Sequence, residues 1–367
     1  MQQPDSPLIK ALLYPLSLLY GIVVGIRNLL FDWGILPSRE FPFPVISVGN
    51  ITVGGTGKTP HVEHIVSILK DDFRIAVLSR GYKRKTSGFR IVSTGSGPDD
   101  VGDEPLQVKK KFPEAEVAVD GNRVRGIKEL CRYNMDLSAF ILDDAFQHRW
   151  VKPGISVLLV DYNRPLNTDM LLPAGGLREY ISAKNRAAIV IVTKCPPDVK
   201  PIGLRLMTKE LDLYPWQSLY FTGFSYGEPL PVFAGSQLFP EREEIKSDNI
   251  HALMVTGIAT PEPLKEYLDT IFPDVRQLIF PDHHRFREKD LRRISREWQS
   301  VGEGKKLIIT TEKDAMRFRN IDVFMPEIRE NMFYIPVRVK FIDKEEDKFN
   351  KQIIDYVRKN KRDHIIC

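Results

Sequence analysis

The most informative stretch of this chain is Asn50-Ile51-Thr52-Val53-Gly54-Gly55-Thr56-Gly57-Lys58-Thr59. It follows an apolar run at residues 43–49 that fits a buried strand, and it precedes residues 61–69, whose apolar side chains recur at helical spacing. Glycines in such a turn let several backbone N–H groups point at one anion, and the start of the helix adds the positive end of its dipole. The stretch therefore predicts a phosphate-binding loop, with a plain glycine-rich turn as the alternative.

The residues expected to contact a nucleotide are Gly54, Gly55, Thr56, Gly57, Lys58 and Thr59. Lys58 would reach the outer phosphates, and the Thr59 hydroxyl would ligate magnesium. The strict form of the motif has glycine where this chain has Thr52, so the loop is a variant in which Gly54 and Gly55 supply the flexibility.

The composition is that of a folded protein without nucleic-acid character. The chain has 367 residues, enough for two domains with separate cores. Its net charge of +5 is not concentrated in a basic stripe with interleaved aromatics, so we expect no nucleic-acid partner, whereas an anionic substrate or membrane surface is compatible. The three cysteines lie far apart, which argues against a disulfide framework or a zinc site and favours the reducing cytosol.

The N-terminal region is hydrophobic without being a typical membrane span. Residues 11–26 carry no charge and lie between Lys10 and Arg27. A spanning helix needs about 20 apolar residues, and this run is shorter and is interrupted by proline, serine and glycine. We expect a helix in the membrane interface, with aromatic side chains such as Tyr20 at the headgroup level and Arg27 reaching outward. A helix buried on the protein's own core and a true span are the alternatives.

The rest of the chain alternates strand-like and helical segments, which predicts an α/β fold with a doubly wound, P-loop-type parallel sheet. The apolar runs expected as strands of this sheet are residues 43–49, 74–79, 117–119, 139–142, 155–160 and 187–192. A second alternation between residues 252 and 311 predicts a smaller α/β domain. The expected organisation is an N-terminal membrane-associating helix at 1–36, a nucleotide-binding domain at 37–211, a lid domain at 212–345 and a C-terminal helix at 346–367.

Two acids follow the apolar run at residues 139–142. A carboxylate at the carboxyl end of a strand can hold magnesium directly or through water, so Asp143 and Asp144 are candidate metal-site residues. Side chains alternate along a strand, so both can face the phosphates only if the strand has ended, or else they have different tasks. Gln147 lies one helical turn further and could be another ligand of the metal or of a water.

Other polar loops have more than one interpretation when taken from the residues alone. Asp103 and Glu104 precede Pro105, which indicates first an ordinary helix start, although the start of a helix at this edge of a parallel sheet is also where a base could meet a substrate. His283 and His284 end a strand-like run and could orient a carboxylate or act as a base near neutral pH, or could simply be solvated.

Taken together, these motifs resemble those of one family, the tetraacyldisaccharide 4'-kinases of lipid A synthesis. The matching stretches run in family order over most of the chain: SVGN at 47–50, VGGTGKTP at 53–60, SRGY at 79–82, GDEP at 102–105, DDAFQHR at 143–149, LPAG at 172–175, LRE at 177–179, FPDHH at 280–284 and TEKD at 311–314. The variant loop with Thr52 and the hydrophobic N-terminus are also typical of that family.

The resemblance implies a reaction, a location and a set of site residues. The reaction is transfer of the ATP γ-phosphate to the 4'-hydroxyl of an acylated glucosamine disaccharide 1-phosphate, giving lipid IVA, with Mg²⁺ as cofactor. The location is peripheral, on the cytoplasmic face of the bacterial inner membrane, and we expect no obligate protein partner.

The resemblance also assigns roles within the site. Asp103 becomes the base for the sugar hydroxyl, supported by His283, which replaces the helix-start interpretation. Arg178 is a charge partner, and Glu104 is a further site residue. The implied metal-site residues are Thr59, Asp143, Asp144, Gln147 and Glu179.

A P-loop GTPase or ATPase that acts as a nucleotide switch or metal chaperone is the alternative function. It would use the same loop and acids. A GTPase is expected to carry an Asn-Lys-x-Asp motif, and residues 192–195, Val-Thr-Lys-Cys, lack its final acid.

Overall fold

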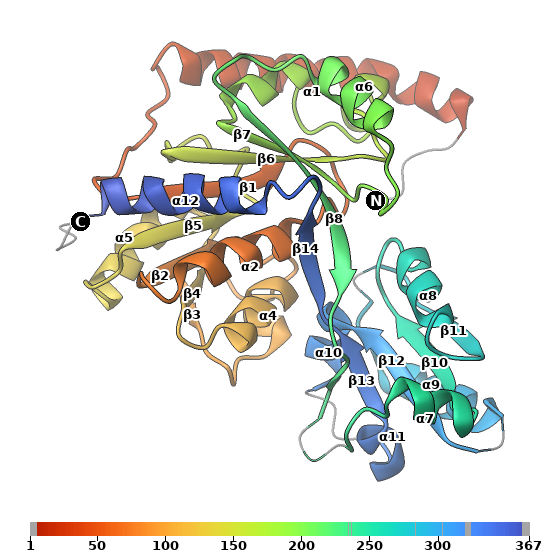
Figure 1. Cartoon of the computed structure of the whole chain (residues 1–367). Coiled ribbons are helices and arrows are strands. Elements are labelled where there is room, and N and C mark those ends of the chain that lie inside the picture. Colours follow the sequence, from red (N-terminus) through yellow and green to blue (C-terminus); the bar gives the residue numbers. More distant parts are fainter. Residues whose placement is uncertain are drawn as a thin grey trace. The chain divides into compact units, whose positions relative to one another are not determined.

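The computed structural model describes residues 6–361 except 234, 236, 283, 303 and 320–323. The chain forms two compact units, one made of Met1–Phe224 with Val339–Cys367 and the other of Ser225–Arg338 (Figure 1). Each unit has its own sheet, as the predicted α/β class requires.

The first unit is built on a sheet that has nine strands within the described residues, in the order β14-β8-β7-β6-β1-β5-β2-β4-β3. The strands are β1 (Val45–Asn50), β2 (Ile75–Ser79), β3 (Arg90–Val92), β4 (Glu116–Val119), β5 (Ala139–Asp143), β6 (Ile155–Asp161), β7 (Ile189–Thr193), β8 (Ser218–Tyr226) and β14 (Val337–Phe341). β1 is parallel to both of its neighbours, β5 and β6, and all its residues are buried. A strand covered on both faces reads as a continuous apolar run, which is why the sequence predicted it.

The helices of this unit cover both faces of the sheet. They are α1 (Pro7–Asp32), α2 (Lys58–Leu69), α3 (Pro98–Val101), α4 (Asp103–Lys111), α5 (Arg123–Tyr133), η1 (Leu166–Thr168), η2 (Ile181–Arg186), α6 (Pro201–Leu211) and α12 (Glu346–Asn360). The strand side chains that pack on α5 and those that pack on α6 lie on the same face of the sheet. Leu142 packs with α5 and is in register with Ser47 of β1, and Leu158 packs with α6 and is in register with Gly49 of β1. Ser47 and Gly49 are two positions apart on one strand and therefore share a face. The alternate side chains of β1 face the other side, where α2 packs on β1 and β5 with α12 beside it (Figure 1).

β1 lies where the connections of the sheet change direction. After β1 the chain crosses to β2 and β4 on one side, whereas β6, β7 and β8 lie on the other. In open parallel sheets, ligands bind at the carboxyl ends of the strands that flank such a switch point. The loops after β1 and β5 are at that position.

The second unit has a five-stranded sheet within the described residues, in the order β11-β10-β12-β13-β9. Its elements are α7 (Arg242–Ser247), α8 (Glu262–Asp269), α9 (Glu288–Ser300), α10 (Glu312–Phe318), α11 (Pro326–Glu330), β9 (Leu230–Pro231), β10 (His251–Thr256), β11 (Val275–Ile279), β12 (Lys306–Thr311) and β13 (Met332–Ile335). β9 is antiparallel to β13, whereas β10 to β13 are parallel. The strand–helix alternation expected between residues 252 and 311 is present, and β9 and β13 extend it.

The units divide at other residues than those expected from composition. The predicted boundaries were 211/212 and 345/346, but the chain divides after Phe224 and after Arg338. β8 and β14 account for the difference, because both belong to the nine-stranded sheet. The proline- and aromatic-rich composition before β8 suggested a new domain, yet an aromatic of β8, Tyr220, lies 5.4 Å from Phe349 of α12, ring centre to ring centre. The C-terminal helix is likewise part of the first unit.

The N-terminal helix α1 is docked on the protein by one side only. Ser17, Gly21, Val24 and Phe31 are buried, although just 17% of its most apolar window is covered. By length and composition it is the one helix among the described residues that could cross a membrane. Gly21 leaves room for Tyr180 at this contact, because a Cβ there would come within 2.4 Å of the Tyr180 hydroxyl unless that side chain shifted. Ser17 and Gly21, two of the residues that weaken α1 as a span, thus lie on the side that is docked on the protein.

Two expectations about α1 were wrong. Tyr20 was placed at the headgroup level, but its hydroxyl donates to the Arg178 carbonyl oxygen at 2.8 Å. Arg27 was expected to reach outward, but its Nη2 lies 3.2 Å from Glu179 Oε1.

Of the cysteines that the structure describes, Cys195 is buried and free.

Candidate active site

The loop between β1 and α2 has the backbone that its glycines require. Gly54 and Gly57 have φ values of +105° and +80°, in the region that glycine adopts without steric cost. A Cβ on Gly57 would also come within 2.4 Å of Phe224 Cζ. Thr52, the variant position, forms an antiparallel bridge with Leu177, so its backbone is paired at the point where the strict motif has glycine.

Three carbonyl groups of the loop are held by donors from elsewhere in the first unit. Arg164 Nη1 donates to the Val53 carbonyl oxygen at 2.9 Å, Thr193 Oγ1 to that of Thr56 at 3.0 Å, and His61 Nδ1 to that of Gly57 at 2.7 Å. The C=O and N–H of a planar trans peptide point in opposite directions. Each of these contacts therefore points the N–H of the following residue, 54, 57 or 58, away from the donor that holds the carbonyl, and backbone N–H groups freed in this way can bind an anion.

His61 joins the loop to β8. Its side chain is buried, and burial lowers its pKa to about 4, so the ring is neutral at physiological pH. A carbonyl oxygen can only accept, so the proton is on Nδ1, facing Gly57. Nε2 is then the acceptor for the Thr222 hydroxyl, 3.0 Å away.

Lys58 begins α2 and points to the end of β1 and to Asp144. Its Nζ lies 3.4 Å from Asn50 Oδ1 and 3.6 Å from Asp144 Oδ1. Arg178 Nη1 lies 3.2 Å from the same Asp144 oxygen. Burial alone would raise the pKa of Asp144, but Lys58 and Arg178 hold it below its usual value. Asp144 is therefore ionised between two cations that an arriving phosphate could share.

Asp143 is buried and incompletely paired. Its Oδ2 accepts from Ser79 Oγ at 2.9 Å, while its Oδ1 has no hydrogen-bond partner within the described part of the chain. Burial, together with the neighbouring carboxylates of Glu104 and Asp144, raises the pKa of Asp143 to about 7. A buried carboxylate with one unused oxygen, next to two other acids, is a position that a hard cation would stabilise.

The backbone around the acid pair shows why both acids can reach the same edge. β5 ends at Asp143, and Asp144 has a left-handed backbone with φ +47°. The strict alternation of a strand stops there, which is the first of the two predicted explanations. The buried Arg123 braces this turn, because its Nη2 donates to the carbonyl oxygens of Asp143 and Asp144 at 3.0 and 3.3 Å.

Asp103 and Glu104 form the first turn of α4, which follows Gly102 at φ +94°. Glu104 lies near enough to Asp143 to raise its pKa. The start of α4, which follows β3 and α3 in the chain, thus brings Glu104 of the first predicted acid pair close to Asp143 of the second.

Gln147 and Glu179 were predicted as metal-site residues, but both bind other groups of the protein. Gln147 Nε2 donates to the Asn50 carbonyl oxygen at 2.8 Å, which fixes the end of β1, and Gln147 Oε1 lies 3.5 Å from Arg178 Nη1. Glu179 is fully buried, and its carboxylate accepts from Asn28 Nδ2 at 3.1 Å and from Arg186 Nη2 at 2.7 Å, besides its pair with Arg27. We therefore leave Glu179 out of the proposed metal site.

The histidine that the sequence favoured as support for Asp103, His283, lies outside the described residues. Its neighbour His284 is engaged within the second unit. His284 Nε2 lies 2.9 Å from Asp290 Oδ2, and its ring stacks on Phe280.

No cluster of three or more His, Cys, Asp or Glu side chains arranged to hold a metal is found in the part of the chain that is described. Mg²⁺ is usually held by one or two carboxylates together with substrate phosphates and water, so Asp143, Asp144 and the Thr59 hydroxyl are a suitable donor set for it.

Sequence reasoning missed the residues that support the site. Arg123, His61, Arg164 and Thr193 act on loop or strand carbonyls, and none belongs to a recognisable nucleotide motif. A threonine ending an apolar run and a histidine one turn into a helix are too common to have been singled out.

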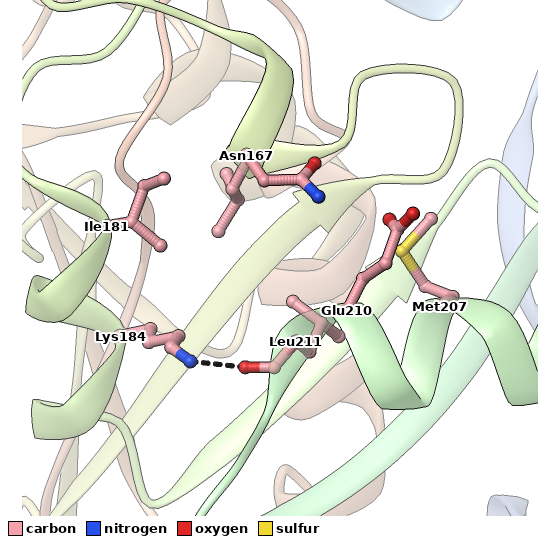
Figure 2. A pocket seen from close by; sticks show the side chains of 7 residues that line it. Asn167, Ile181, Lys184, Met207, Glu210 and Leu211 are labelled. Carbon is pink, nitrogen blue, oxygen red and sulfur yellow. Dashed lines mark hydrogen bonds between the residues drawn. The ribbon is translucent and has the colours of Figure 1, made fainter.

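A separate small pocket lies between η1, η2 and α6. It is lined by Leu166, Asn167, Ile181, Lys184, Met207, Glu210 and Leu211, and Figure 2 shows Lys184 Nζ donating to the Leu211 carbonyl oxygen. None of the predicted site residues lines it.

The glycine loop, its first helix and the buried acids at the end of the adjacent parallel strand define a P-loop nucleotide-binding protein. The family described as tetraacyldisaccharide-1-P 4'-kinase matches residues 9–358. The chain belongs to this family.

Individual relatives agree. A tetraacyldisaccharide 4'-kinase of Phocaeicola vulgatus is 48% identical, covering 95% of this chain and 96% of the relative, and that of Bacteroides thetaiotaomicron is 47% identical, covering 95% and 94%. Among solved structures, LpxK from Aquifex aeolicus in complex with ATP has a TM-score of 0.72 at 28% identity, covering 95% of this chain and 99% of that one.

Proposed function

We propose that this protein transfers the γ-phosphate of ATP to the 4'-hydroxyl of a tetraacyldisaccharide 1-phosphate, giving lipid IVA. Membership of the kinase family supports the reaction, and the ATP in the Aquifex aeolicus relative supports the nucleotide. The nucleotide-switch alternative has no comparable support.

The observation that carries the proposal is the preorganised loop. Its carbonyls are bonded outward by Arg164, Thr193 and His61, so the loop need not be reordered when a phosphate arrives. Phosphoryl transfer depends on positioning and charge neutralisation more than on covalent chemistry, and preorganised donors are an effective way to supply both.

The roles of the residues follow from their surroundings. Lys58 and Arg178 would exchange their contacts with Asp144 for the phosphate oxygens, and Asp103 would accept the proton of the attacking sugar hydroxyl. Asp143, Asp144 and Thr59 would hold Mg²⁺. The bound metal would neutralise charge that develops on the β- and γ-phosphate oxygens.

We further propose that the protein is peripheral, on the cytoplasmic face of the inner membrane, and that α1 provides its contact with lipid. Leu8 and Leu12 of α1 are 82% and 77% exposed, and further large apolar side chains are exposed along the helix. Such a helix, held on one side by the protein, suits insertion into one leaflet better than a full span.

The test is transfer of label from γ-labelled ATP to tetraacyldisaccharide 1-phosphate in mixed micelles. We expect label in the lipid, dependent on Mg²⁺ and lost in Lys58→Ala. Label released only into water would support the switch alternative, and no release at all would contradict both.

A further inference from the structure

Arg178 connects three parts of the first unit. Its backbone N–H donates to the Ile51 carbonyl oxygen at 2.7 Å, at the entry to the glycine loop. Its carbonyl oxygen accepts from the Tyr20 hydroxyl of α1 at 2.8 Å. Its guanidinium reaches Asp144 at 3.2 Å. The loop, the N-terminal helix and the acid pair are therefore joined through one residue.

The next residue, Glu179, ties the same segment to α1 a second time. Its carboxylate has no exposed surface and is shared by Arg27 and Asn28 of α1 and by Arg186 of η2. A buried carboxylate with three donors is held in one position, because moving it would leave buried charges unpaired. Glu179 thus restrains the chain on the C-terminal side of Arg178.

The helix and the segment also fit closely over a longer stretch. Ser17 Oγ accepts from the backbone N–H of Ala174 at 2.9 Å, and Gly21 allows Tyr180 to approach α1. At the far end, Arg149 Nη1 donates to the Asn28 carbonyl oxygen at 2.9 Å. A helix that served only as a membrane anchor would need no more than an apolar face. The contacts of α1 described above are instead polar and specific, and they involve residues next to the phosphate site.

We propose that Tyr20 and Glu179 are positioning residues that set the Arg178 guanidinium against Asp144 and the phosphate loop, so that α1 is part of the frame of the nucleotide site. This inference rests on the proposed function only in taking the loop as the nucleotide site. It changes the task of Glu179 from the metal ligand that the resemblance implied to a tie between α1 and Arg178.

The experiment is a double-mutant cycle on nucleotide affinity in the full-length protein, in detergent and without lipid acceptor. Tyr20→Phe removes one hydroxyl, and we expect it to weaken binding of a non-hydrolysable ATP analogue with Mg²⁺ by about 2- to 10-fold, the range for one lost hydrogen bond. Arg178→Ala should weaken binding on its own, and Tyr20→Phe should then have no further effect.

Tyr14→Phe is the matched control, because it removes the same hydroxyl from an exposed position of the same helix, and its affinity should equal that of the wild type. Glu179→Gln should weaken analogue binding at least as much as Tyr20→Phe. If it unfolds the protein, the Tyr20 cycle still decides the question.

Two results would overturn the proposal. One is wild-type affinity in Tyr20→Phe, and the other is a Tyr20→Phe loss that persists unchanged in the Arg178→Ala background. Because no lipid acceptor is present, the cycle also separates this inference from the proposed reaction. A wild-type protein that failed to phosphorylate lipid could still show the coupling.

Discussion

Replacing His61 with asparagine should change how the stability of the protein depends on pH. Asparagine removes the titrating ring, while its Nδ2 can still donate to the Gly57 carbonyl oxygen in place of His61 Nδ1. The bond between Nε2 and the Thr222 hydroxyl is lost. The substitution therefore separates the titration of the ring from its bond to the loop.

The magnitude follows from the pKa. In the folded protein the pKa of His61 is about 4, against an ordinary value of 6.5. The unfolded chain binds a proton that the folded protein does not, so the stability that this group contributes is present above pH 6.5 and is lost as the pH falls toward 4. Between roughly pH 7.5 and 5, the wild type should lose about 2 kcal/mol of unfolding free energy through this residue.

The assay is urea denaturation of the wild type and His61→Asn at both pH values, with the two losses compared. The pKa of His148 is also lowered to about 4 by burial, but its contribution is common to both proteins and cancels in the difference. We expect His61→Asn to be the less stable protein at the higher pH, by about 1 kcal/mol for the lost hydrogen bond, and to lose about 2 kcal/mol less on acidification.

Thr222→Val is the control, because it keeps the ring buried while removing its hydroxyl partner, and it should retain the wild-type pH dependence. An equal loss of stability in the wild type and His61→Asn would refute the picture of a buried, neutral ring under the glycine loop.

Lys58→Ala should weaken MgATP binding and reduce kcat together, because the ammonium faces the phosphates throughout the reaction; calorimetry showing unchanged affinity would contradict this. Asp103→Asn should leave ATP affinity near that of the wild type and reduce kcat by about 10²–10⁴-fold, so a purely KM effect in steady-state kinetics would remove it as the base. The pKa of Asp143 is about 7 in the folded protein, against an ordinary value of 3.8, so the free energy of unfolding falls as the pH rises from 3.8 through 7. At a pH above 7, Asp143→Asn should therefore have a higher melting temperature than the wild type, while its turnover is abolished. Leu12→Ser with Leu19→Ser should reduce co-sedimentation with anionic vesicles, since both side chains are exposed on α1; unchanged sedimentation would show that lipid binds elsewhere.

The predicted fold class and family are confirmed. They could be predicted because the sequence patterns that indicate them each lie within a few neighbouring residues. Continuous apolar runs such as β1 and β5 indicate buried parallel strands, and Gly54 and Gly57 indicate the backbone turn between them. The catalytic and metal roles of Asp103, Asp143 and Asp144 stay predictions.

The domain boundaries failed for a physical reason. A shift in composition indicates a change of environment, but β8 and β14 join their sheet through backbone pairing, which composition does not record. Two segments from distant parts of the chain therefore belong to the first unit, although the residues between them form another core.

The sequence by itself determined the glycine loop, the strand–helix alternation and the acids at the strand ends, because backbone freedom and hydrophobic periodicity act over a few neighbouring residues. Only the tertiary structure decided the tasks of the polar side chains around them. Glu179 meets Arg27 across 152 positions of sequence, and Tyr20 meets Arg178 across 158. A carboxylate takes its role from the charges that folding brings beside it, and nothing in its neighbouring sequence specifies which charges those will be.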